Sequence, residues 1–249
     1  MAIRVYKKII YSPKKRLIFL FSYFSLIIGS LLLFWSLYPV ISFEIYSKIF
    51  LEDKAKSPIV NKQSPEPLEN AQSVLGSFNI FSNNLKDYTN VSLWFPAITY
   101  NDNEFSQLMS SSAKEYYLSI PKINIKEAKV IINGDDLEKG LIHYLPKTLP
   151  GEYGNVVIFG HSTLPQLYNP KDYKTIFTYL PSLEKGDLIK VKIGDLEYTY
   201  EVFEMFIVNP EQIWVLDQQK DNAYLTLITC VPPGTYLKRL VVKAKIKLI

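Results

Sequence analysis

The feature that most restricts how this chain can fold is an uncharged, apolar stretch near its N-terminus. Residues 17–43 contain no charged side chain, and residues 17–38 are the most apolar part of that stretch. A helix of about 20 apolar residues spans the hydrocarbon core of a bilayer. Because this stretch is apolar on every side, a helix buried in the core of a globular domain is disfavoured. We therefore predict a transmembrane helix over residues 17–38 that ends near Pro39.

The charges around this stretch predict its orientation. Residues 1–16 carry six basic side chains and no acidic one, whereas acidic side chains reappear after residue 43. Basic residues favour the cytoplasmic side of a membrane. We therefore expect a cytoplasmic leader at residues 1–16, a single pass through the cell membrane and an extracellular remainder. The alternative is a cleaved signal peptide, but its apolar region is usually only about 7–15 residues long.

The basic character of the chain resides in this leader. The whole sequence has a net charge of +4, but the residues after position 16 include 22 basic and 24 acidic side chains, a net charge of −2. Nucleic-acid binding is therefore not indicated, because it requires a basic surface.

The rest of the chain divides into a linker and a folded domain. Residues 53–90 are rich in Lys, Ser, Asn, Gln and Pro, which is typical of a linker, and apolar residues return at 91–100. We interpret residues 39–112 as an extracellular stalk or linker that is partly ordered. Residues 113–249 are expected to form the folded domain.

The folded domain has the sequence pattern of an all-β protein. Seven runs of β-branched and aromatic residues are bounded by Gly, Pro, Asn or Asp. These runs are 116–120, 128–132, 155–160, 187–193, 197–208, 223–229 and 239–249. Residues 171–183 are the one stretch with a short helical or turn-like pattern. Several strands at short intervals predict a closed barrel or a sandwich.

Three residues with useful chemistry occur at the ends of predicted strands. Cys230 follows one strand, His161 follows another, and Arg239 begins the last. A thiol can act as a nucleophile and an imidazole can take or return its proton. A guanidinium can stabilise the oxyanion of acyl transfer. The three are far apart in the sequence, so only the fold can bring them together.

Each of the three also has a purely structural interpretation. A lone cysteine is often a small buried hydrophobic residue, and His161 could be a structural or surface histidine. Because side chains alternate between the two faces of a strand, Arg239 and three lysines of the same predicted strand would lie on one face. Arg239 could therefore begin a solvated basic face. One cysteine and two histidines without zinc spacing predict no metal site, and one cysteine permits no intrachain disulfide.

Three motifs, in order along the chain, resemble the sortase family. TLITC at 226–230, followed nine residues later by Arg239, resembles the sortase strand that carries the nucleophile. Residues 137–163, which contain GHS, resemble the segment that ends in the catalytic histidine, here His161. Residues 174–191 resemble the part that follows. The resemblance covers about residues 116–249, together with the N-terminal anchor that the family has.

The resemblance implies a closed sortase-type β-barrel with short helical turns, preceded by a transmembrane helix. It implies that Cys230 cuts a sorting motif of LPxTG type between Thr and Gly and forms a thioester. His161 would protonate the leaving amine and activate the incoming one, and Arg239 would bind the oxyanion or position the substrate. Thr229 would help to line the substrate groove. His143 matches a histidine of the family but is expected to have no catalytic role.

The implied partners are surface proteins that carry the sorting motif and an amine acceptor on a cell-wall precursor or a pilin lysine. No cofactor is expected, and Asp135, Asp136 and Glu138 are interpreted as turn residues, not as a calcium site. Two alternatives remain open. The chain could be a membrane-tethered cysteine endopeptidase with water as the acceptor, or an extracellular β-barrel that binds a partner without catalysis.

Overall fold

A computed structural model describes residues 13–50, 89–91, 94–95 and 114–247. Most of the predicted leader, and the predicted stalk apart from residues 39–50, 89–91 and 94–95, lie outside the described residues. The chain divides into two compact units, residues 1–42 and residues 43–249. Each unit is described by itself below.

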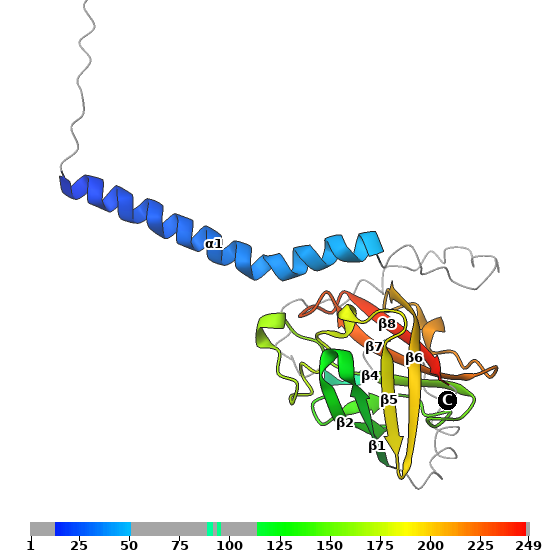
Figure 1. The fold of residues 1–249 in the computed structure, drawn as a ribbon. Coiled ribbons are helices and arrows are strands. Elements are labelled where there is room, and N and C mark those ends of the chain that lie inside the picture. The colour runs from blue at the N-terminus through cyan, green and yellow to red at the C-terminus, as the bar shows by residue number, and fades with distance from the viewer. Residues whose placement is uncertain (1–12, 51–88, 92–93, 96–113, 248–249) are drawn as a thin grey trace, which may run out of the picture. The chain divides into compact units, whose positions relative to one another are not determined.

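The N-terminal helix α1 (Pro13–Phe50) is longer than predicted. It continues through Pro39, so the expectation that it ends near this residue is wrong. A proline inside a helix removes one backbone hydrogen bond and bends the helix, but it need not end it. Figure 1 shows a bend in the later, lighter blue part of α1. Within α1, residues Leu17–Ile49 are long and apolar enough to cross a membrane.

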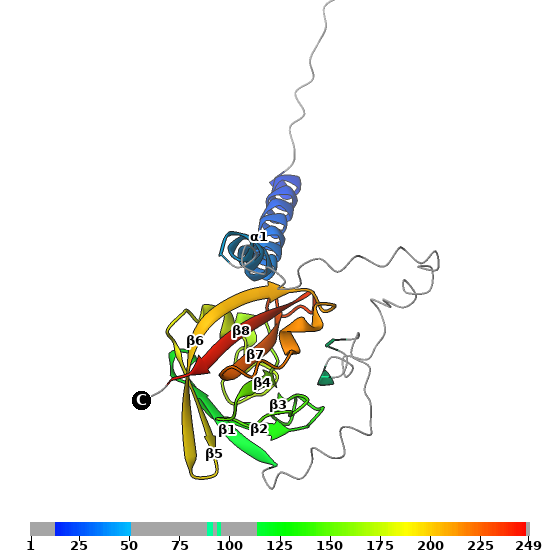
Figure 2. The same cartoon turned by 90° about the vertical axis from the view of Figure 1, so that its right-hand side faces the viewer.

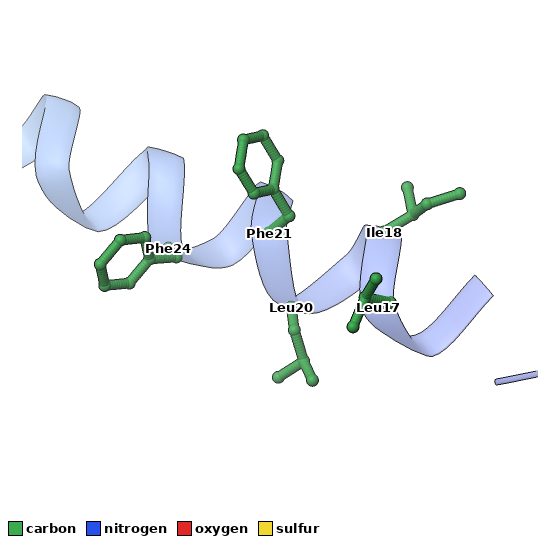
Figure 3. A pocket seen from close by; sticks show the side chains of 5 residues that line it. All are labelled: Leu17, Ile18, Leu20, Phe21 and Phe24. Atoms are coloured by element: carbon green, nitrogen blue, oxygen red, sulfur yellow. The ribbon is translucent and has the colours of Figure 1, made fainter. Parts of the chain in front are cut away.

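Between residues 17 and 43 the side chains of α1 are uncharged, and apolar side chains lie on all sides of the helix. Figure 3 shows that five of them point in different directions from successive turns, and each is at least 63% exposed. They are Leu17, Ile18, Leu20, Phe21 and Phe24. The shallow hollow between them is lined by apolar side chains of this one helix, a surface that suits lipid chains better than a polar ligand.

The second unit contains a closed β-barrel, so the predicted all-β class is confirmed (Figures 1 and 2). The strands are β1 (Glu115–Ile120), β2 (Ile125–Ile132), β3 (Leu141–His143), β4 (Gly154–Phe159), β5 (Leu188–Ile193), β6 (Leu196–Val208), β7 (Ala223–Val231) and β8 (Lys238–Ile246). Around the barrel they follow the order β1-β2-β3-β4-β7-β8-β6-β5. The pairs β2·β3 and β4·β7 are parallel and the other pairs are antiparallel.

Two segments differ from the simple strand pattern. Strand β3 was not predicted, because three residues are too few for an alternation to be visible in the sequence. Residues 171–183 form turns and a short 3-10 helix at Leu180–Ser182, within the helical or turn-like expectation.

The sheet is buried on both faces where the candidate residues lie. One apolar cluster fills the barrel and includes the inward side chains of β7, such as Leu225 and Leu227. A second cluster covers the outer face of β4, β7, β8 and β6, and it includes Ile228 and Cys230. Because successive side chains of a strand point to opposite faces, Cys230 lies on the outer face, within this second cluster.

Candidate active site

Three neighbouring strands bring the candidate residues together. Cys230 on β7 is the direct cross-strand partner of Arg239 on β8. Strand β4 runs parallel to β7 on its other side, and their register ends at the pair Phe159 and Ile228. His161 comes two residues after the end of β4. The three residues therefore lie at one end of a three-stranded block, although 69 positions separate His161 from Cys230 in the sequence.

Side-chain hydroxyls join the ends of β4 and β7. The Ser162 hydroxyl, next to His161, donates to the carbonyl of Cys230 at 2.6 Å. The Thr229 hydroxyl, next to Cys230, donates to the carbonyl of Gly160 at 2.7 Å. Thr229 has no exposed surface in this structure, so its side chain is not placed in an open groove.

Arg239 is a buried cation held by backbone carbonyls. Its Nη1 donates to the carbonyls of Tyr236 at 2.9 Å and Lys238 at 3.3 Å. Its Nη2 donates to the carbonyl of Trp94 at 3.1 Å. Only 5% of its surface is exposed, so the alternative that Arg239 begins a solvated face is wrong.

A segment that precedes the barrel in the sequence covers this site. We call its described residues, 89–91 and 94–95, the covering segment. Its backbone pairs with the loop between β2 and β3: the Val91 N–H donates to the carbonyl of Asp135, and the Leu137 N–H donates to that of Thr89. These residues belong to the predicted stalk, residues 39–112. The apolar run at 91–100 was the signal that part of the stalk is ordered.

Trp94 of the covering segment lies among the candidate residues. The guanidinium carbon of Arg239 is 5.3 Å from the centre of the Trp94 ring, a cation–π distance. The Trp94 and His161 rings are 5.7 Å apart, and the Trp94 and Phe159 rings meet edge to face at 5.4 Å. Trp94 therefore helps to shield His161 and Arg239 from water.

Burial sets the protonation states in this covered site. It raises the pKa of the Cys230 thiol to about 11, and the nearby positive charge of Arg239 opposes that rise. It lowers the pKa of His161 to about 4, and the charge of Glu138 opposes that shift. The covered site therefore holds a neutral thiol and a neutral imidazole, and a neutral thiol is less reactive than a thiolate.

The described residues contain no group of His, Cys, Asp and Glu side chains that could hold a metal ion. Asp136 accepts the backbone N–H of Glu138 at 2.9 Å and pairs with Lys139 at 2.9 Å, as a turn residue does. The second histidine, His143, is buried, and both of its ring nitrogens lack partners in the described part of the chain.

The sequence of the barrel decides the family. The family model of the sortase domain matches residues 118–247, more than half of the chain. The chain belongs to the sortase family. The matched range includes Cys230, His161 and Arg239, whereas the covering segment lies outside it.

Individual sortases give the extent of the similarity. The chain is 33% identical over 133 residues to Sortase D of Bacillus subtilis, which covers 51% of this chain and 61% of that protein. It is 29% identical over 119 residues to Sortase A of Staphylococcus aureus, covering 46% of this chain and 53% of that protein. The chain thus spans less than two thirds of each of these relatives. Sortase C-1 of Actinomyces oris has a similar fold, with a TM-score of 0.50 and 25% identity over 62% of this chain and 88% of that one.

Proposed function

We propose that this sortase is a membrane-anchored cysteine transpeptidase. It cleaves an LPxTG-like sorting motif of a surface protein between Thr and Gly and transfers the acyl group to an amine. The observation that carries the proposal is the meeting of Cys230, His161 and Arg239 at the ends of β7, β4 and β8, three adjacent strands of a rigid sheet. Catalytic groups need this kind of fixed support.

In the first step the Cys230 sulfur attacks the Thr carbonyl carbon of the motif. The thiol proton passes to His161, whose Nε2 has no hydrogen-bond partner among the described residues. A sulfur–carbon bond forms, and the carbonyl π electrons move to the oxygen. When this intermediate collapses, the carbon–nitrogen bond to Gly breaks, the leaving nitrogen takes the proton from His161, and a thioester remains.

Arg239 stabilises the oxyanion of this intermediate. Its Nη2 already donates to a carbonyl oxygen, that of Trp94, so a substrate oxygen at the same place would meet a donor that is already oriented. Such a preoriented donor strengthens its hydrogen bond as negative charge develops on the oxygen.

In the second step an acceptor amine resolves the thioester. His161 takes a proton from the amine, the nitrogen attacks the thioester carbon, and a new amide bond forms as the sulfur–carbon bond breaks. The Cys230 thiolate then recovers the proton from His161. The acceptor is an amine of a cell-wall precursor or a pilin lysine, and the surface proteins that carry the motif are the donors.

Mass spectrometry of the full chain with a panel of sorting peptides tests this proposal. We expect an acid-stable acyl adduct on Cys230, and a peptide–amine product when an amine nucleophile is added. Cys230→Ala should remove both species while the chain stays folded, as circular dichroism would show. An active Cys230→Ala variant would contradict the proposed nucleophile.

The products also separate the alternatives. A peptide that is cleaved but never joined to the added amine would make the chain an endopeptidase with water as acceptor. A peptide that binds but is never cleaved, with no adduct on Cys230, would make it a binding module.

A further inference from the structure

The hydrogen-bond pattern changes where β4 and β7 stop pairing. Along the ladder the two strands are joined by backbone bonds up to the pair Phe159 and Ile228. The Gly160 N–H makes one more bond, to the Ile228 carbonyl at 3.1 Å. Beyond it the two chain segments are linked by the two hydroxyl bonds described above.

These two bonds run in opposite directions. The Thr229 hydroxyl of β7 reaches the Gly160 carbonyl, and the Ser162 hydroxyl beyond β4 reaches the Cys230 carbonyl. At 2.7 and 2.6 Å both are at or below the usual length of an O–H···O bond. Together they bracket His161, because Gly160 and Ser162 are its two neighbours in the chain.

The other side of His161 is held by a different part of the protein. Its carbonyl accepts the N–H of Phe177 at 2.9 Å, and the Thr163 N–H donates to the Thr178 hydroxyl at 3.0 Å. His161 is therefore attached to the turn around residues 175–178 independently of β7. Without the hydroxyl bonds, the chain after Gly160 would be free to follow that turn away from Cys230.

We propose that Thr229 and Ser162 are positioning residues, and that their hydroxyls form a clamp that sets the separation between the Cys230 sulfur and the His161 imidazole. This inference rests on the proposed function, because the separation matters for proton transfer between these two groups. Neither hydroxyl has to touch the substrate. The buried Thr229 hydroxyl is already committed to Gly160, which favours positioning over groove lining.

Variants of the full chain in detergent micelles test the clamp. Thr229→Val and Ser162→Ala each remove one of the two hydroxyls, whereas Ser162→Thr keeps a hydroxyl at position 162. We expect kcat for a sorting peptide to fall about tenfold in the first two, because small misplacements of reacting groups are costly, while KM stays within about twofold. Ser162→Thr should recover most of the lost kcat.

Thr226→Val is the matched control. Thr226 is a buried threonine on the same strand, and its hydroxyl donates to Asn155 Oδ1 at 2.7 Å, away from the strand ends. We expect this variant to lower the melting temperature but to keep a wild-type kcat. An equal loss of kcat in Thr226→Val would show a general effect of lost stability and would overturn the clamp.

A second measurement does not depend on peptide turnover. The pH dependence of Cys230 alkylation by iodoacetamide reports the environment of the thiol, and we expect its midpoint to move by about half a pH unit in the clamp variants but not in Thr226→Val. If the wild-type chain turns over no sorting peptide, the proposed function fails and this profile alone decides the clamp. Unchanged alkylation profiles in both Thr229→Val and Ser162→Ala would overturn the proposed clamp. If Thr229→Val does not fold, the profile of Ser162→Ala alone decides whether the clamp exists.

Discussion

Arg239 illustrates how a single residue can be charged, buried and fully oriented. Three backbone carbonyls accept its guanidinium N–H groups, and the face of the Trp94 ring lies against it. A planar guanidinium can serve several acceptors at fixed angles, whereas the ammonium group of lysine is a point charge on a flexible stem.

We therefore predict that Arg239→Lys keeps the fold but lowers kcat/KM for a sorting peptide by about 100-fold, the usual cost of losing one oxyanion donor. Lys245→Met, which removes an exposed charge from the same strand, should leave kcat/KM near the wild-type value. Steady-state kinetics of the two variants provide the test. A near-normal Arg239→Lys enzyme would show that only the charge is needed.

His143 is a buried histidine whose pKa lies far below its usual value. It is 1% exposed, burial lowers its pKa to about 3, and its ring meets that of Tyr116 edge to face. An unfolded histidine has a pKa of about 6.5. Protons therefore bind the unfolded chain more readily, and the stability that neutral His143 contributes is complete above about pH 6.5 and is lost as the pH falls toward 3.

We predict that His143→Leu flattens the pH dependence of stability. Between about pH 7 and pH 4.5, His143 alone should lower the free energy of unfolding by about 2–3 kcal/mol, and His161 should add a similar loss. Urea unfolding at both pH values, followed by tryptophan fluorescence, measures the difference. Equal losses of the free energy of unfolding in the wild type and in His143→Leu would mean that His143 can be protonated in the folded state.

At the scale of elements, the covering segment helps to bury the site. Its backbone is paired with the β2–β3 loop, and its Trp94 side chain packs on His161, Phe159 and Arg239. The same burial keeps the Cys230 thiol and the His161 imidazole neutral. Exposure of the site should therefore lower the pKa of the thiol and raise that of the imidazole.

We predict that Trp94→Ala increases the rate of Cys230 alkylation at pH 7 by about tenfold, because each unit by which the thiol pKa falls gives about ten times more thiolate. Trp214→Ala is a matched control. Trp214 stacks on Phe206 at 5.4 Å over the same face of the sheet. We expect Trp214→Ala to lower the melting temperature without increasing the rate of Cys230 alkylation. Equal alkylation rates in Trp94→Ala and Trp214→Ala would contradict a specific role of Trp94.

The elements also show what the sequence could predict. Strands such as β6 and β8 were evident because their runs are long and bounded by turn residues. Cys230, His161 and Arg239 were predicted as catalytic from their strand-end positions and the sortase motifs; the structure brings their strands together, and their catalytic roles stay a prediction. Trp94 could not be assigned to the site from the sequence. Its contacts with Phe159 and Arg239 join residues that are far apart in the sequence, and no local sequence pattern predicts such contacts. The pairing of Ser162 with Cys230 was missed for the same reason.

At the scale of the whole molecule, we propose a membrane topology. Helix α1 is long and apolar enough to cross a membrane, and the basic leader favours a cytoplasmic N-terminus with an extracellular catalytic domain. This orientation would place the site where surface proteins and cell-wall amines are found.

We predict that, in a Cys230→Ala background, a cysteine introduced by Ser64→Cys reacts with a membrane-impermeant maleimide in intact cells. One introduced by Ser12→Cys, on the other side of α1, should react only after the cells are permeabilised. Gel-shift detection of the labelled chain measures both. The reverse pattern would place the barrel in the cytoplasm.

Strand β8 has a consequence for how the enzyme is made. In the barrel it lies between β6 and β7, although it follows both in the sequence, and it carries Arg239. A chain that has been synthesised only as far as β7 therefore contains Cys230 but lacks both Arg239 and the strand that joins β6 to β7. Under the proposed function, we expect such a chain to be inactive until β8 pairs with both neighbours.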